Sequence, residues 1–218
     1  MINRIVGLHF SPGGGTATIT EELINEIAER ISSECAADVS CETYDIFRRP
    51  DSIPEFDENT IAVIGMPVRI GKLPIPAIRI LNKLEGSGAM SIALVSYGAS
   101  SYGNALYELY RLAEDRGFKV VGAGAFISRH INSEDGLLTR PNKEDLQALG
   151  RFAVAATGKI KRLAGCEIEG LKVEPAPINL CGSIPIHRIS RLSPEAAALA
   201  ERTLEKLFAC KSDPEWYL

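Results

Sequence analysis

The chain has 218 residues, of which 45% are hydrophobic, and its formal net charge is −4. These values are typical of one globular domain, or of one domain with a short appendage, and the mildly acidic charge gives no electrostatic reason to expect a nucleic acid partner. No apolar run approaches the roughly 20 residues that span a bilayer, and the N-terminus lacks the pattern of a signal peptide, so we expect no membrane partner and no export signal.

Apolar runs alternate with stretches of helical periodicity along most of the chain. Runs rich in β-branched residues predict strands, and amphipathic spacing predicts helices. The predicted elements, in chain order, are a strand at 3–10, a helix at 17–33, strands at 39–47 and 60–66, a helix at 73–84, a strand at 90–96, a helix at 101–116, a strand at 118–127 and a helix at 139–163. This alternation predicts an α/β fold with a doubly wound, five-stranded parallel sheet of order 2-1-3-4-5.

The C-terminal part of the chain has a different character. It begins with an extended, proline-rich stretch, and a serine followed by a proline at 193–194 then predicts the start of one more helix. We therefore expect an α/β domain at 1–164 and a C-terminal extension at 165–218, made of an extended segment and one helix. This extension is a candidate surface for a homodimer.

The five cysteines are widely spaced and form no C-x-x-C pair. An odd number at such spacings argues against a disulfide framework, a zinc site and an iron–sulfur cluster. We expect reduced thiols in a cytoplasmic protein.

A glycine-rich segment joins the first predicted strand to the first predicted helix. It reads Ser11-Pro12-Gly13-Gly14-Gly15-Thr16-Ala17-Thr18. Glycines let the backbone approach a ligand closely and a helix N-terminus favours an anion, so we expect a phosphate held by amides and by the hydroxyls of Ser11, Thr16 and Thr18 alone. No lysine or arginine lies in or beside this segment, which excludes a P-loop, and the glycines match G-x-G-x-x-G imperfectly. A tight turn without a ligand is the alternative.

Two further loops follow strands at the edge of the sheet where ligands bind in such folds. The loop at 65–72 is expected to form a wall against a flat ring, with Arg69 and Lys72 facing either an anionic substrate or solvent. The loop at 96–104 places two tyrosines among small residues, which suits stacking on an aromatic ligand. The alternatives are an ordinary connection for the first loop and a structural role for either tyrosine in the second.

The histidines give weaker signals. His9 lies within the first strand, and we expect a hydrogen-bonded core histidine there. His130 follows the fifth strand and is a candidate for a ligand or proton-transfer role. No spacing suggests a catalytic triad or a cysteine–histidine pair, so we assign no catalytic residue and no metal site.

The three loops, in this order, resemble those of the flavodoxin superfamily. The resemblance is greater to flavodoxin-like domains that precede a bacterial-type ferredoxin domain, in which an S-x-T-G-N-T loop holds the phosphate of flavin mononucleotide (FMN); here the loop reads Ser11-Pro12-Gly13-Gly14-Gly15-Thr16. The resemblance covers about residues 1–165. It implies an FMN-binding protein that transfers electrons or hydride, which includes an FMN-dependent oxidoreductase. The partner would be a redox protein or a small-molecule electron acceptor.

The resemblance also implies which residues hold the cofactor. Those assigned to the phosphate are Ser11, Gly13, Gly14, Gly15, Thr16 and Thr18. Those assigned to one side of the flavin ring are Met66, Pro67, Val68 and Arg69. Those assigned to its other side or edge are Ser96, Tyr97, Gly98 and Tyr102. Gly65 or Gly98 is expected to supply backbone flexibility near the flavin N5.

The chain departs from this family at several positions. Gly13 and Gly15 stand where a hydroxyl residue and an asparagine are usual, so two side-chain donors to the phosphate are absent. Each donor contributes roughly 1 kcal/mol, and more to a charged acceptor. Their loss predicts an FMN affinity that is lower by ~10- to 100-fold or more. Arg69 stands where an aromatic residue is usual. The cysteines of the ferredoxin domain are absent, which excludes an internal iron–sulfur relay on ligand count.

These departures leave two alternative functions open. One is a degenerate flavodoxin-like module that binds no flavin and acts through protein contacts, with the aromatic C-terminus at 216–218 as a candidate contact. The other is a nucleotide-dependent reductase with a modified Rossmann turn, in which Asp45 at the end of the second strand would serve as the acidic residue.

Overall fold

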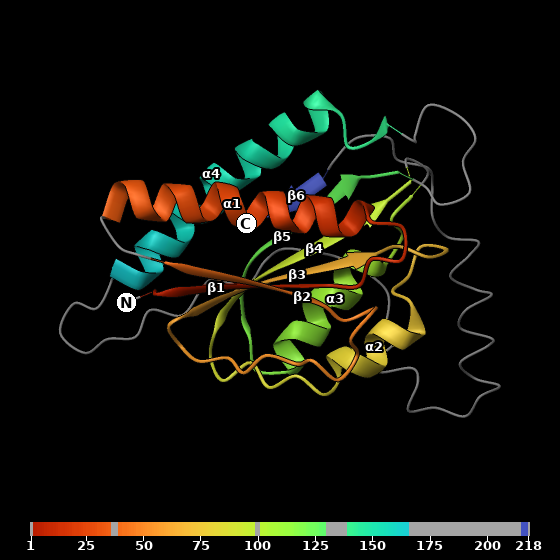
Figure 1. Cartoon of the computed structure of the whole chain (residues 1–218), viewed down its shortest axis with the longest axis horizontal. Coiled ribbons are helices and arrows are strands. Elements are labelled where there is room, and N and C mark those ends of the chain that lie inside the picture. The colour runs from red at the N-terminus through yellow and green to blue at the C-terminus, as the bar shows by residue number, and fades with distance from the viewer. Residues whose placement is uncertain (1, 36–38, 99–100, 130–138, 166–214, 218) are drawn as a thin grey trace.

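The computed structural model describes residues 2–35, 39–98, 101–129, 139–165 and 215–217. Its elements, in chain order, are β1 (Arg4–His9), α1 (Gly15–Cys35), β2 (Ser40–Asp45), β3 (Thr60–Pro67), α2 (Ile75–Leu81), β4 (Met90–Tyr97), α3 (Ala105–Asp115), β5 (Lys119–Ile127), α4 (Lys143–Gly165) and β6 (Glu215–Tyr217) (Figure 1). The strands and helices predicted as far as residue 163 are therefore present. Helices α2, α3 and α4 begin two to four residues later than predicted, because polar and proline-containing loops precede them.

The strands form one sheet of order β2-β1-β3-β4-β5-β6. The first five are parallel, which confirms the predicted order 2-1-3-4-5. β6 pairs antiparallel with β5, with Trp216 opposite Gly124, and was not predicted. The rest of the predicted extension, including its helix, lies in residues 166–214, outside the described part of the chain, so its domain boundary stays a prediction.

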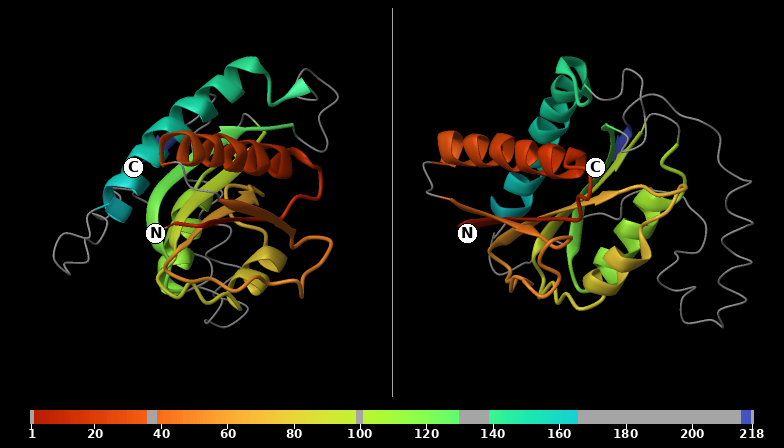
Figure 2. Two further views of the ribbon diagram at one scale, coloured as in Figure 1. Left: turned by 60° about the vertical axis from the view of Figure 1, so that its left-hand side comes forward. Right: turned by 45° about the vertical axis from the view of Figure 1, so that its right-hand side comes forward.

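Helices cover both faces of this sheet. α1 and α4 lie together on one face, and α2 and α3 lie on the other, as all views show (Figures 1 and 2). Successive residues of a strand point to opposite faces, so Ile5 packs into the core under α1 and α4, whereas Val6 and Leu8 pack into the core on the α2 and α3 side. This explains why the central strands are apolar at nearly every position. Among the described helices, none is long and apolar enough to cross a membrane.

The first turns of α1 lie unusually close to β3. A Cβ atom at Gly65 would overlap the Oγ1 atom of Thr20, which itself donates a hydrogen bond to the carbonyl of Thr16 at 2.8 Å. Gly65 therefore serves the packing of the helix on the sheet. This is a different role from the backbone flexibility expected of it.

His9 ends β1 on the α1 face of the sheet and is 4% exposed. Its Nε2 lies 3.7 Å from Oε1 of Glu21 on α1, but its Nδ1 has no hydrogen-bond partner among the described residues. His9 is thus a core histidine, as predicted, but the expectation that it is fully hydrogen-bonded is wrong. Burial lowers its pKa below the usual value, and this effect outweighs the opposing influence of the carboxylates of Asp45 and Glu21.

We predict that Gly65→Ala lowers the free energy of unfolding by about 1–3 kcal/mol, the range for overpacked cores, because the added methyl group meets Thr20. Adding Thr20→Ala should recover part of the loss. Gly150→Ala on α4 is the matched control: the nearest neighbour of the new Cβ is 3.9 Å away, and the free energy should be unchanged or higher by up to ~1 kcal/mol. Denaturant titration measures the three variants and the wild type, and a Gly65→Ala protein as stable as the wild type contradicts the packing argument.

We also predict that stability falls as the pH is lowered below about 6.5, where the unfolded chain protonates His9 and the folded chain resists protonation. A group with a lowered folded-state pKa contributes stability above its unfolded pKa and loses it as the pH falls toward the folded value. His9→Asn should therefore show a smaller loss of melting temperature between pH 7 and pH 5. Superimposable pH profiles for the two proteins would show that the buried imidazole has no such effect.

Candidate functional site

A cleft of about 1010 Å³ opens at the carboxyl ends of the parallel strands. It is bordered by all three loops that the sequence analysis singled out. The predicted site residues that line it are Gly13, Gly15, Thr16, Pro67, Val68, Arg69, Ser96, Tyr97 and Gly98. The tertiary structure therefore brings together the central part of each predicted loop.

The first loop is shaped by its own hydroxyl groups. Ser11 is 6% exposed, and its Oγ accepts a hydrogen bond from the amide of Ala17 at 2.9 Å. The Oγ1 of Thr18 donates to the carbonyl of Gly14 at 3.2 Å. Ser11, Gly14 and Thr18 do not border the cleft, so these hydroxyls stabilise the turn, whereas Thr16 lines the cleft.

Backbone donors of this loop remain available to a ligand. Within the described residues, the amides of Gly13, Gly15 and Thr16 donate to no protein acceptor. They lie at the N-terminus of α1, where the helix dipole carries a partial positive charge. Such an arrangement can bind an anion of the size of a phosphate group.

A buried hydrogen bond joins the first and third loops. The Oγ1 of Thr16 lies 2.7 Å from the Oγ of Ser96, and the two residues are 3% and 4% exposed. Both line the cleft. The start of α1 and the end of β4 are therefore fixed relative to each other at the cleft floor.

The second loop contains a tight two-residue turn. Arg69 and Lys72 exchange backbone hydrogen bonds of 2.8 and 3.1 Å, and the residues between them, Ile70 and Gly71, have φ of 51° and 70°. Positive φ is uncommon for a β-branched residue, and such strain persists only where the surroundings hold it. The third loop does so through the amide of Asn104, which donates to the carbonyl of Gly71 at 2.7 Å.

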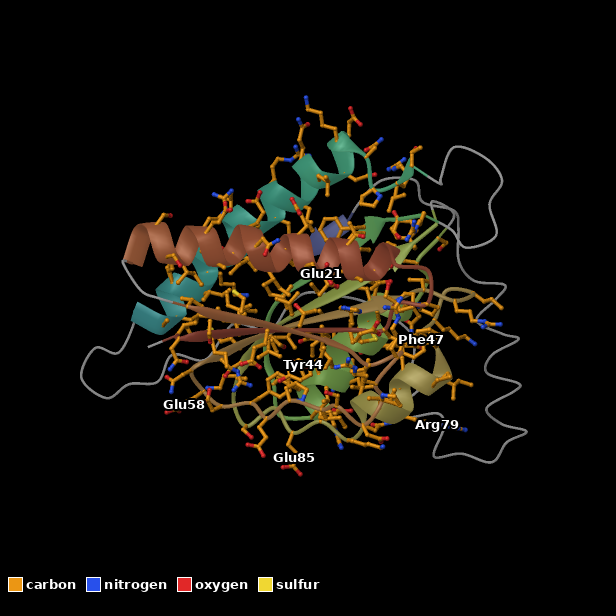
Figure 3. All side chains as sticks on the ribbon, in the orientation of Figure 1. Glu21, Tyr44, Phe47, Glu58, Arg79 and Glu85 are labelled. Carbon is orange, nitrogen blue, oxygen red and sulfur yellow. The ribbon has the colours of Figure 1, made fainter. Side chains whose placement is uncertain are left out.

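Two phenylalanines that the sequence analysis missed supply part of the apolar lining. Phe10 follows β1 and Phe47 follows β2, and their rings meet edge to face with centroids 5.1 Å apart. Phe47 is 45% exposed and lies near α2 (Figure 3). The available signal was the position of each aromatic residue at the end of a predicted strand, on the edge where ligands bind.

Two predicted ring contacts do not border the cleft. Met66 is fully buried in the core, and Tyr102 is 8% exposed. Tyr97 lines the cleft but is only 3% exposed, because its ring packs edge to face on Tyr102 with centroids 5.6 Å apart. These contacts favour the structural role that was left open for the tyrosines.

A positive charge lies at the glycine loop. The Nε atom of Arg129, two residues beyond the end of β5, donates to the carbonyl of Gly13 at 2.7 Å, and both Ser128 and Arg129 line the cleft. The expectation of an uncharged loop is therefore wrong. The two partners are 116 positions apart in sequence, so only the sheet brings them together. His130, the other candidate after β5, lies outside the described residues.

Asp45, the acidic residue considered for a nucleotide-dependent reductase, is engaged elsewhere. Its Oδ1 accepts hydrogen bonds from the amides of Phe47 and Arg48 at 3.0 and 3.1 Å. It does not border the cleft. Its carboxylate stabilises the turn after β2.

No family model matches the sequence, and no curated protein matches it either. Solved structures do match. An oxidoreductase from Corynebacterium diphtheriae superposes with a TM-score of 0.52 at 11% identity, over 74% of this chain and 98% of its own. A flavodoxin from the domain Archaea superposes with a TM-score of 0.49 at 18% identity, over 72% of this chain and 99% of its own. Flavodoxin 2 from Bacillus cereus superposes with a TM-score of 0.47 at 14% identity, over 72% of this chain and 99% of its own.

At such identities the likeness concerns the fold. The chain has five parallel strands in the order 2-1-3-4-5 with helices on both faces. The superposition on the Corynebacterium diphtheriae protein agrees with this arrangement. The chain has the flavodoxin-like fold, the fold of the flavodoxin superfamily.

Proposed function

We propose that this chain binds FMN in the cleft and acts in electron or hydride transfer. The observation that carries the proposal is the group of amides at Gly13, Gly15 and Thr16, which donate to no acceptor among the described residues and border the same cleft as a broad apolar wall. An anion site beside an apolar surface suits a ligand with a phosphate at one end and a flat ring at the other.

The phosphate end of the ligand would lie at the first loop. The three free amides and the hydroxyl of Thr16 are donors there, and the α1 dipole favours the negative charge. No carboxylate of the described residues lines the cleft to oppose it. Glu21, which could have done so, points from α1 toward His9.

The ring end would lie against the second loop and the two phenylalanines. Pro67, Val68 and Ile70 supply apolar surface, and Phe10 and Phe47 extend it. The bound isoalloxazine would supply the redox chemistry, which no side chain of the cleft offers. The chain's own residues would orient the ring and exclude water from it.

The edge of the cleft also supports an exchange of electrons with a partner. Phe47, Ile70 and Ile75 are 45%, 67% and 48% exposed, and all three line the cleft. Exposed apolar side chains gathered at one site mark interaction surfaces. They fit docking of a redox partner protein or entry of a small-molecule acceptor, and they equally favour the second candidate, an interaction module without flavin.

We predict that the purified apoprotein binds one FMN per chain, with quenching of flavin fluorescence and a shift of the visible flavin bands on titration. Chemical reduction and reoxidation of the complex should then be reversible in the same spectrum. An apoprotein that leaves the FMN spectrum unchanged contradicts the proposal and favours the interaction module.

We predict that Thr16→Val weakens FMN binding about tenfold, because it removes a hydroxyl at the phosphate end of the cleft together with the hydrogen bond that joins it to Ser96. Thr18→Val is the matched control: it makes the same chemical change in the same loop, at a hydroxyl that bonds the carbonyl of Gly14 outside the cleft. It should change the dissociation constant less than twofold. Equal effects of the two substitutions would mean that the phosphate does not lie at Thr16.

A further inference from the structure

The residues that follow β5 fill the space that the loop glycines leave open. A Cβ atom at Gly14 would overlap the Nη2 atom of Arg129, and a Cβ atom at Gly15 would overlap the Oγ atom of Ser128. Gly14 also has a φ of 81°, which side-chain-bearing residues rarely adopt. The side chains of Arg129 and Ser128 therefore lie directly against these two glycines.

Arg129 brings a positive charge to the glycine loop. Its hydrogen bond from Nε to the carbonyl of Gly13 holds the guanidinium beside the glycine loop. A guanidinium has five N–H donors, so the others remain for a ligand. Among the described residues, no acidic side chain forms an ion pair with Arg129.

Ser128 is the second donor, and it is 3% exposed. Its amide donates to the carbonyl of Tyr97 at 2.9 Å, which fixes the residue between β4 and the glycine loop. Its hydroxyl lies beside Gly15, lines the cleft and has no hydrogen-bond partner among the described residues. A hydroxyl that borders the cleft can donate its hydrogen to a ligand bound there.

We propose that Ser128 and Arg129 are anion-binding residues of the cleft and that Arg129 makes the site selective for a phosphorylated flavin. In this view, β5 supplies the side-chain donors that the loop lacks at Gly13 and Gly15. The inference rests on the proposed FMN site. It adds Ser128 and Arg129 as side chains that bind the phosphate, and the positive charge of Arg129 as the basis of selectivity for it.

This arrangement offsets the affinity loss expected from the loop alone. A guanidinium bonded to phosphate contributes more than a neutral donor, because the hydrogen bond is charge-assisted. Arg129 is solvent-exposed, however, so its interaction with the ligand should weaken as salt is added. Riboflavin, which has the same ring and no phosphate, should not respond to the charge.

The test is titration of the full chain and its variants with FMN and with riboflavin. Arg129→Gln should raise the dissociation constant of FMN at least tenfold and change that of riboflavin less than twofold. The wild-type affinity for FMN should also fall more steeply with added salt than that of the variant. Arg129→Lys, which keeps the charge without the planar fork, should give an intermediate FMN affinity.

Arg151→Gln is the matched control, since it removes one positive charge from an exposed position on α4 that does not line the cleft. It should leave both dissociation constants unchanged. Ser128→Ala should weaken FMN binding about three- to tenfold with riboflavin binding unaffected, and unchanged melting temperatures of the apoproteins will show that the variants fold. Equal effects of Arg129→Gln on FMN and riboflavin, or no effect, overturn the proposal.

Inorganic phosphate separates this inference from the proposed function. It should raise the melting temperature of the wild-type apoprotein and should not do so for Arg129→Gln. If the wild type binds neither flavin but shows this Arg129-dependent response, the flavin assignment fails and the anion site remains. If it binds both flavins with equal affinity and phosphate has no effect, the anion site fails and flavin binding remains.

Discussion

The close packing of the first turns of α1 against β3 is the constraint on which the cleft depends. It is possible because Gly65 has no side chain where Thr20 lies. The hydrogen bond between Thr16 and Ser96 then joins the same helix start to the end of β4. A helix held this way directs its first amides toward one point at the edge of the sheet, where no described residue accepts their hydrogen bonds.

The two ends of the cleft differ in physical character. One end offers amides, hydroxyls and the guanidinium of Arg129, and the other offers apolar side chains such as Phe47 and Ile70. An anion that binds the folded chain at the polar end would also raise its stability, because ligand binding favours the folded state. The strained backbone of Ile70, held by the third loop, indicates that the apolar wall is also kept in a fixed shape.

The sequence was sufficient for the elements and for the three loops that border the cleft. Continuous apolar strands, amphipathic helices and the glycine segment at 11–18 depend on local periodicity and turn chemistry, which neighbouring residues determine. The sheet order followed from the regular alternation of strands and helices. What could not be read locally was the role of each loop residue: Met66 and Tyr102 lie inside the protein, and Gly65 serves helix packing.

The sequence by itself therefore determined a doubly wound sheet with a glycine-rich corner at the end of its first strand. Only the tertiary structure decided which side chains meet at that corner. Arg129 reaches Gly13 across 116 residues, Phe10 meets Phe47 from separate strands, and β6 pairs with β5 from the far end of the chain. These contacts depend on strand order and register. The local sequence around one partner does not predict which residue it will contact.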